Sequence, residues 1–180
     1  KAVLFSHADS TGTRMVEGKV ARRGLCGDVY LIGEPAGSRI EEVRVRTSTR
    51  EWTIEFDATL QGVDPDTTYL LRARVLDGDR VVREFNSPRF RTSDLQDHRI
   101  TFAQRWRPAK LWDLNTPGNL YRVQLSLLDE RGRLLDRAWP ETFGFREFWI
   151  EGRDFYLNGS RIYLSTVPLD NAQVGAAWAT

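Results

Sequence analysis

The feature that most constrains the fold of this 180-residue chain is a regular alternation of apolar and polar residues. The clearest run covers residues 52–60, where Trp, Ile, Phe, Ala and Leu alternate with Thr, Glu, Asp and Thr. The same period of two recurs at residues 43–46, 69–75 and 121–127, with a shorter run at 100–102. This is the period of a β-strand that has one face in a core and the other in solvent. The pattern therefore predicts an all-β protein built of antiparallel strands.

Turn sequences separate these runs, among them Asp77-Gly78-Asp79, Glu130–Arg133 and Asn158-Gly159. Asn-Gly favours a type I′ hairpin because both residues tolerate positive φ. Asn158-Gly159-Ser160 is also an N-glycosylation sequon, although turn formation alone accounts for it. With about seven strands between residues 40 and 143, we expect an immunoglobulin-like antiparallel β-sandwich.

The last residues of the chain have a different pattern. An alanine-rich segment at 171–178 follows a short strand-like run, and Asp170 or Asn171 is a candidate N-cap for a helix. A strand followed by a helix is the opening of an α/β unit and does not belong to a sandwich. Because the chain begins at Lys1 and ends inside this predicted helix, we expect it to be a piece of a longer protein.

Charge and composition exclude several classes of protein. The 26 Lys+Arg and 25 Asp+Glu residues give a net charge of +1. This balance argues against a general binder of nucleic acid or of an anionic membrane. No apolar run approaches the roughly 20 residues that span a bilayer. Cys26 is the only cysteine, so no internal disulfide is possible, and both a cytoplasmic and a secreted or extracytoplasmic location stay open. Arginines greatly outnumber lysines, which scattered surface ion pairs explain more simply than a phosphate site.

Motifs for catalysis are missing. His7 and His98 are the only histidines, and neither has a cysteine nearby. Dinucleotide, phosphate-loop and nucleophile-elbow motifs are absent. We therefore predict no metal, no cofactor and no catalytic residue within these 180 residues. Acidic residues in turns and on outward strand faces, Asp129-Glu130 among them, are expected to be solvated.

The six tryptophans have two possible roles. Trp52 and Trp106 fit core positions between two sheets. Trp112, Trp139 and Trp149 lie in the second half of the chain. An exposed row of these three rings would offer faces for stacking on sugars, but packing between domains or under loops is the favoured interpretation for each.

Four segments resemble glycoside hydrolase family two, the β-galactosidase, β-glucuronidase and β-mannosidase family. Trp106–Asp113 followed by Asn115–Val123 resembles the "LW…P-x-LY" segment of its immunoglobulin-like domain, and Phe143–Arg146 matches its "FGFR" junction. Phe155–Leu164 resembles the "F-x-LNG-x-x-x-x-L" hairpin that leads into the catalytic barrel. Arg23–Leu31 is similar to the "GGIWRDVYL" stretch that closes the jelly roll. Departures, such as Cys26-Gly27 in place of Trp-Arg, indicate a divergent branch.

The resemblance implies a division into three parts. Residues 1–36 would be the tail of a jelly-roll sugar-binding domain, and residues 37–144 an immunoglobulin-like β-sandwich. Residues 145–180 would hold a hairpin and the first strand and helix start of a (β/α)8 barrel. The neighbouring jelly-roll and barrel domains of the same polypeptide would be its partners, together with the carbohydrate substrate; no nucleic acid or membrane partner is expected.

The resemblance also implies retaining hydrolysis by two glutamates, one an acid/base and the other a nucleophile. The family's acid/base glutamate lies in an Asn-Glu pair, and this chain contains none. These residues would therefore supply scaffold, with Asp170 and Asn171 as candidate substrate contacts. One alternative is a fibronectin type III or immunoglobulin-like module that binds carbohydrate or protein, with Tyr69 as a "tyrosine corner". Another is a small free-standing hydrolase that uses surface carboxylates.

Overall fold

A computed structural model of the protein describes residues 33–165, and Gly33–Tyr163 form one compact unit. Across this range the regular secondary structure is almost entirely β-strand, with a single 3₁₀ turn, η1 (Thr92–Asp94), and no α-helix. No helix in the range is long and apolar enough to cross a membrane. The strands are β1 (Arg39–Ser48), β2 (Thr53–Gln61), β3 (Tyr69–Asp77), β4 (Arg80–Asn86), β5 (Arg99–Arg105), β6 (Tyr121–Asp129), β7 (Leu134–Arg137), β8 (Glu141–Phe143), β9 (Phe148–Glu151), β10 (Asp154–Leu157) and β11 (Ser160–Ile162).

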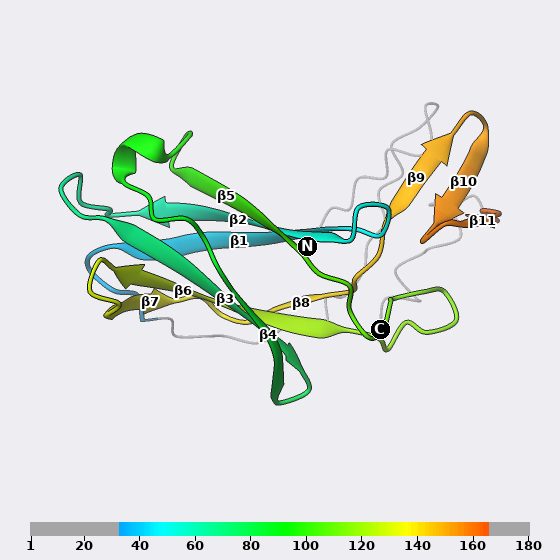
Figure 1. Cartoon of the computed structure of the whole chain (residues 1–180), viewed down its shortest axis with the longest axis horizontal. Helices are drawn as coiled ribbons and strands as arrows, with labels where there is room; N and C mark the ends of the chain where they lie inside the picture. Colours follow the sequence, from blue (N-terminus) through cyan, green and yellow to red (C-terminus); the bar gives the residue numbers. More distant parts are fainter. Residues whose placement is uncertain (1–32, 166–180) are drawn as a thin grey trace, which may run out of the picture. The chain divides into compact units, whose positions relative to one another are not determined.

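The strands form three antiparallel sheets. One has the order β1-β2-β5, and a second has the order β4-β3-β6, with β7 and then β8 on the free side of β6. These two sheets form the layers of a sandwich, and the small sheet β9-β10-β11 follows it (Figure 1). The predicted antiparallel β-sandwich is confirmed, with eight strands between residues 39 and 143.

The core lies between the two layers and contains the apolar half of each alternating run. On β2, Ile54, Phe56 and Leu60 are fully buried. The Phe56 ring centroid lies 5.0 Å from that of Phe102 on β5 and 5.8 Å from that of Phe85 in the opposite layer. The other layer contributes further buried side chains, namely Tyr69, Leu71, Ala73, Val75, Tyr121, Val123, Leu125 and Leu127. Burial of this apolar surface is the main favourable contribution to folding.

The turns follow the chemistry that the sequence predicts. Asn158 (φ 51°) and Gly159 (φ 90°) both have positive φ between paired Leu157 and Ser160, as a type I′ hairpin requires. Tyr69 forms the expected tyrosine corner, because its hydroxyl accepts a hydrogen bond from the Asp64 N–H at 2.7 Å. This bond fixes the loop that enters β3.

Two expectations are wrong. Trp52 does not belong to the strand; it lies in the β1–β2 turn with φ 53°, and β2 begins one residue later. Asp129 is not solvated, since its side chain is only 8% exposed. It accepts hydrogen bonds from the Arg131 and Arg133 N–H groups at 3.0 and 2.8 Å, and from Arg133 Nε at 3.0 Å. The β6–β7 turn needs a carboxylate to satisfy these donors, and a count of charged residues in the sequence does not show that need.

The outer edge of the larger sheet is divided. Both β7 and β8 pair with β6, and residues 138–140 interrupt them. Within the interruption, Trp139 is 76% exposed and Pro140 has no N–H to donate. This edge of the sandwich is therefore two short strands in place of one long strand.

Several predictions lie outside the described residues. They concern the jelly-roll segment Arg23–Leu31, the barrel start, and the candidate substrate contacts Asp170 and Asn171. The proposed domain boundaries at residues 36 and 144 also stay predictions.

Candidate functional site

Three motif segments that are distant in the sequence meet at one place beside the sandwich. The Trp112 N–H donates to the Phe145 carbonyl at 3.0 Å. Asn158 Nδ2 donates to the Trp112 carbonyl at 2.7 Å, and Asn158 Oδ1 accepts from the Glu147 N–H at 3.0 Å. The Asn158 N–H in turn donates to the Glu147 carbonyl at 2.9 Å. We call this arrangement of Trp112, residues 143–147 and Asn158 the motif junction.

Asn158 can join the segments because of its place in the hairpin. A type I′ turn requires a residue that tolerates positive φ, and Asn does so while keeping an amide side chain. The amide nitrogen of this side chain donates one hydrogen bond and its oxygen accepts one, both inside the junction. The nitrogen that glycosylation of the sequon would modify therefore already has a backbone partner.

Gly144 allows the "FGFR" segment to approach Trp112 closely. A Cβ atom at position 144 would lie 2.6 Å from Trp112 Cβ and 2.7 Å from its Cγ, closer than real Cβ contacts. The next residue, Phe145, is fully buried. Its ring is stacked with that of Trp52 at 6.3 Å and meets that of Trp106 edge-on at 5.5 Å. Phe145 thus anchors the junction in the sandwich core.

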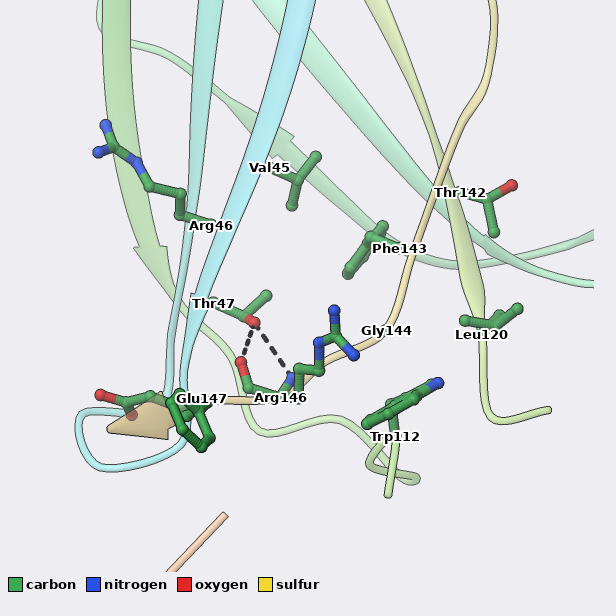
Figure 2. A pocket seen from close by; sticks show the side chains of 11 residues that line it. Val45, Arg46, Thr47, Trp112, Leu120, Thr142, Phe143, Gly144, Arg146 and Glu147 are labelled. Carbon is green, nitrogen blue, oxygen red and sulfur yellow. Dashed lines mark hydrogen bonds between the residues drawn. The ribbon is translucent and has the colours of Figure 1, made fainter. Parts of the chain in front are cut away.

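Arg146 fastens the same segment to β1 and to Trp112. The Thr47 hydroxyl accepts from the Arg146 N–H at 3.1 Å and donates to its carbonyl at 2.6 Å (Figure 2). The Arg146 guanidinium carbon lies 4.2 Å from the Trp112 ring centroid, which is a cation–π contact. The backbone and the side chain of Arg146 therefore bind different parts of the junction.

The Glu147 carboxylate accepts several hydrogen bonds from the β1–β2 turn. Its Oε2 accepts from Ser48 Oγ (2.8 Å), the Thr49 N–H (2.8 Å) and the Arg50 N–H (3.0 Å). Its Oε1 accepts from Arg50 Nε at 2.7 Å, and the Glu147 side chain is 12% exposed. Burial acts to raise the pKa of this carboxyl, but the hydrogen bonds and charge of Arg50 and the Ser48 hydroxyl outweigh it and bring the pKa to about 2.

A groove of about 580 Å³ runs between β1 and the "FGFR" segment. Figure 2 shows Val45 and Thr47 on the β1 side, with Trp112 and Leu120 across from them. Glu147 supplies the only carboxylate among its lining residues, and the donors of the β1–β2 turn already engage that carboxylate. A pair of carboxylates for acid/base work is therefore not found in this groove. Among residues 33–165 no group of three or more His, Cys, Asp or Glu is placed to hold a metal ion.

The aromatic rings in and beside the junction are packed, mainly against arginines. Trp52 has Arg107 at 4.5 Å from its ring centroid, and Trp149 has Arg50 at 4.8 Å. Trp149 is also stacked on Tyr156 at 5.5 Å. The packing interpretation is confirmed for Trp112 and Trp149, whereas Trp139 is exposed. Some of the many arginines therefore cover aromatic faces, which adds to the surface ion pairs that the sequence suggested.

Sequence reasoning found the segments of the junction but missed Glu147 and Thr47. Each lies about a hundred residues along the chain from its partner, so no local pattern signals the contact. The position of Glu147 directly after Phe143–Arg146 is the one feature that could have drawn attention to it.

Comparison with known proteins identifies one family for the chain. The sequence profile described as "Glycosyl hydrolases family 2" matches residues 38–146. A protein named "Beta-galactosidase" from Vibrio vulnificus is 30% identical over 155 residues, which cover 80% of this chain and 14% of that protein. A "Beta-galactosidase" from Lactobacillus delbrueckii subsp. bulgaricus is 27% identical over 143 residues, 77% of this chain and 13% of that protein.

Solved structures give a weaker likeness. The crystal structure of a β-glucuronidase from Bacteroides uniformis matches with a TM-score of 0.47 and 20% identity, covering 69% of this chain and 16% of that one. A β-glucuronidase from Ruminococcus gnavus gives a TM-score of 0.46 at 21% identity, covering 72% and 19%.

Proposed function

Because the chain belongs to family 2 of the glycosyl hydrolases, we propose that it acts as the immunoglobulin-like scaffold of a longer glycoside hydrolase. The chain spans 13–14% of the length of the curated relatives it matches. The observation that carries the proposal is the motif junction, where Asn158 of the hairpin is bonded to Trp112 and Glu147 beside the sandwich. A rigid connection of this kind suits a part that sets the direction of the next domain.

The chemistry would belong to other parts of the polypeptide. Retaining hydrolysis by an acid/base glutamate and a nucleophilic glutamate, which the family resemblance implies, needs two carboxylates about 5–5.5 Å apart. In the proposed scheme both come from the barrel, and this chain positions the barrel's first hairpin. The names of the relatives support a β-galactoside as the first substrate class to test.

The surface of the small sheet supports packing against a further domain. Phe148 and Ile150 are two residues apart on β9, so they lie on one face of the sheet, and they are 50% and 61% exposed. Apolar side chains side by side on a surface favour an interaction site. We assign this face to contact with the barrel, and other surfaces of the sandwich to contact with the jelly roll.

Aryl glycosides test the proposal. The 180-residue chain should give no turnover, whereas the longer gene product should hydrolyse at least one substrate, with aryl β-galactosides tested first. Asn158→Ala in the longer product should lower kcat, because the hairpin loses its anchor. Asn115→Ala, at an exposed loop position, is the matched control and should leave kcat unchanged. Turnover by the 180-residue chain alone would overturn the scaffold proposal.

The non-enzymatic binding module is the second candidate. The 76% exposed Trp139 favours it, because a free indole face can stack on a sugar. Calorimetric titration of the chain with galactosides and other oligosaccharides separates the two functions. A scaffold gives no saturable heat, whereas saturable binding that Trp139→Ala abolishes would establish the module.

A further inference from the structure

The β1–β2 turn concentrates hydrogen-bond donors on one carboxylate. Three consecutive residues, Ser48, Thr49 and Arg50, supply four donors at 2.7–3.0 Å to the two oxygens of Glu147. Adjacent backbone N–H groups that converge on one oxygen form an anion-binding concavity, and the guanidinium adds a charge-assisted bond to the other oxygen. The donors therefore match both oxygens of a planar carboxylate.

The donors are arranged by the turn itself. The pairing of Ser48 with Thr53 and the positive φ of Trp52 fix the path of the backbone. The Glu51 N–H donates to Ser48 Oγ at 3.1 Å, which leaves the Ser48 hydroxyl hydrogen for the carboxylate. None of these constraints involves Glu147, which lies 97–99 residues further along the chain.

The turn also holds a donor that Glu147 does not use. Thr49 is 8% exposed, and its Oγ1 is buried without a hydrogen-bond partner in the part of the chain that the structure describes. Buried hydroxyls are usually satisfied. The turn therefore keeps one buried donor beyond the four that Glu147 engages.

We propose that the β1–β2 turn is a carboxylate-binding site in its own right, and that Glu147 is its resident ligand. A small free carboxylate occupies the same site when the Glu147 side chain is removed. Formate is the matched probe, because it has the carbon and two oxygens of the carboxylate group that Glu147→Ala removes. Chloride is a single atom. It therefore cannot accept hydrogen bonds from the turn N–H groups and from the guanidinium on two separate atoms, as a carboxylate does.

Thermal unfolding of the Glu147→Ala chain in sodium formate and in equal concentrations of sodium chloride tests the proposal. Loss of the side chain should lower the melting temperature by about 4–10 °C. Formate should then raise it with the logarithm of its concentration above the dissociation constant, by about 3–6 °C at ten times that constant, while chloride has no such effect. The wild type, whose site is filled, should respond equally to the two salts.

Glu84→Ala is the matched control, because it also removes one carboxylate that pairs with arginines, at 3.6 Å from Arg72 and 3.9 Å from Arg74 on an exposed strand face. It should show no formate-specific rise. Amide NMR adds a direct measurement: the Thr49 and Arg50 signals of the Glu147→Ala chain should move with formate. Equal action of both salts on that variant, or amides that do not move, would overturn the proposal. If Glu147→Ala does not fold, Glu147→Ser, whose short side chain also leaves room for formate, takes the same titration with the same required shifts.

Discussion

At the scale of single residues, Glu147 makes the folded chain less stable at acidic pH than at neutral pH. Its pKa is about 2 in the folded chain against an ordinary value of 4.5, so the folded state favours the charged form. The stability this provides is complete above pH 4.5 and is lost as the pH falls towards 2. The pKa difference corresponds to about 3 kcal/mol, or about 2 kcal/mol after solvent screening of the 59% exposed Arg50.

The measurement is the free energy of unfolding in urea from pH 7 to pH 2, compared between the wild type and Glu147→Gln. Other carboxyls with a lowered pKa, such as Asp129, contribute equally to both chains. The difference between the chains should therefore shrink by about 2 kcal/mol as the pH falls. A difference that stays constant with pH would show that Glu147 does not titrate as its contacts require.

The sequence predicted individual residues well where the reason was local. Asn158 was identified from the Asn-Gly turn, and Tyr69 from the resemblance of its segment to a fibronectin type III domain. Asp129 and Glu147 were not identified, because the contribution of a carboxylate to stability depends on which hydrogen-bond donors the fold brings to it. Gly144 was quoted as part of a motif, but only the 2.6 Å approach to Trp112 gives the physical reason for a glycine there.

At the scale of elements, the Asn158 side chain binds the β10–β11 hairpin to Trp112 and Glu147 beside the sandwich. Asn158→Gly keeps positive φ available and removes only the two side-chain hydrogen bonds, so it should cost about 1–3 kcal/mol. Asn158→Ala should cost about 1–2 kcal/mol more, because alanine disfavours the left-handed conformation. Chemical denaturation of both variants provides the comparison.

Asn115→Ala again serves as the control and should unfold like the wild type. The ordering of the two Asn158 variants is the critical result. If the Asn158→Gly chain is as stable as the wild type, the hydrogen bonds of the Asn158 side chain with Trp112 and Glu147 do not hold the hairpin.

Strands were predictable because the sequence of each strand alternates between buried apolar and exposed polar residues. The alternation at residues 54–60 and 69–75 reflects a core face and an outer face, and this local pattern is enough to locate β2 and β3. Pairing partners were not predictable in the same way. Nothing in β6 indicates that it takes β3 on one side and both β7 and β8 on the other, since that arrangement depends on contacts far along the chain.

At the scale of the whole described unit, the sandwich and the small sheet should unfold together. A chain that ends at Arg146 keeps Phe145 in the core but loses Glu147 and Asn158, and a chain that ends at Phe143 loses Phe145 as well. Because Phe145 is fully buried between Trp52 and Trp106, the shorter chain should be less stable than the longer one by about 3–5 kcal/mol. Urea unfolding of the three chains gives the values.

The full chain should show one cooperative transition for residues 33–163, and the chain ending at Arg146 should melt below it. Equal stability of the two truncated chains would mean that the Phe145 ring is not part of the core. Two separate transitions in the full chain, assigned by tryptophan fluorescence and circular dichroism, would mean that the junction does not couple the sheets.

The divided edge formed by β7 and β8 bears on how the folded chain behaves at high concentration. A long free strand edge invites another molecule to add its own strand, and repeated addition leads to aggregation. Here the first partner strand ends after four residues, and Pro140 then offers no donor. An incoming chain would find too few consecutive sites to stay attached, so the break acts as a safeguard against fibre-like growth along this side.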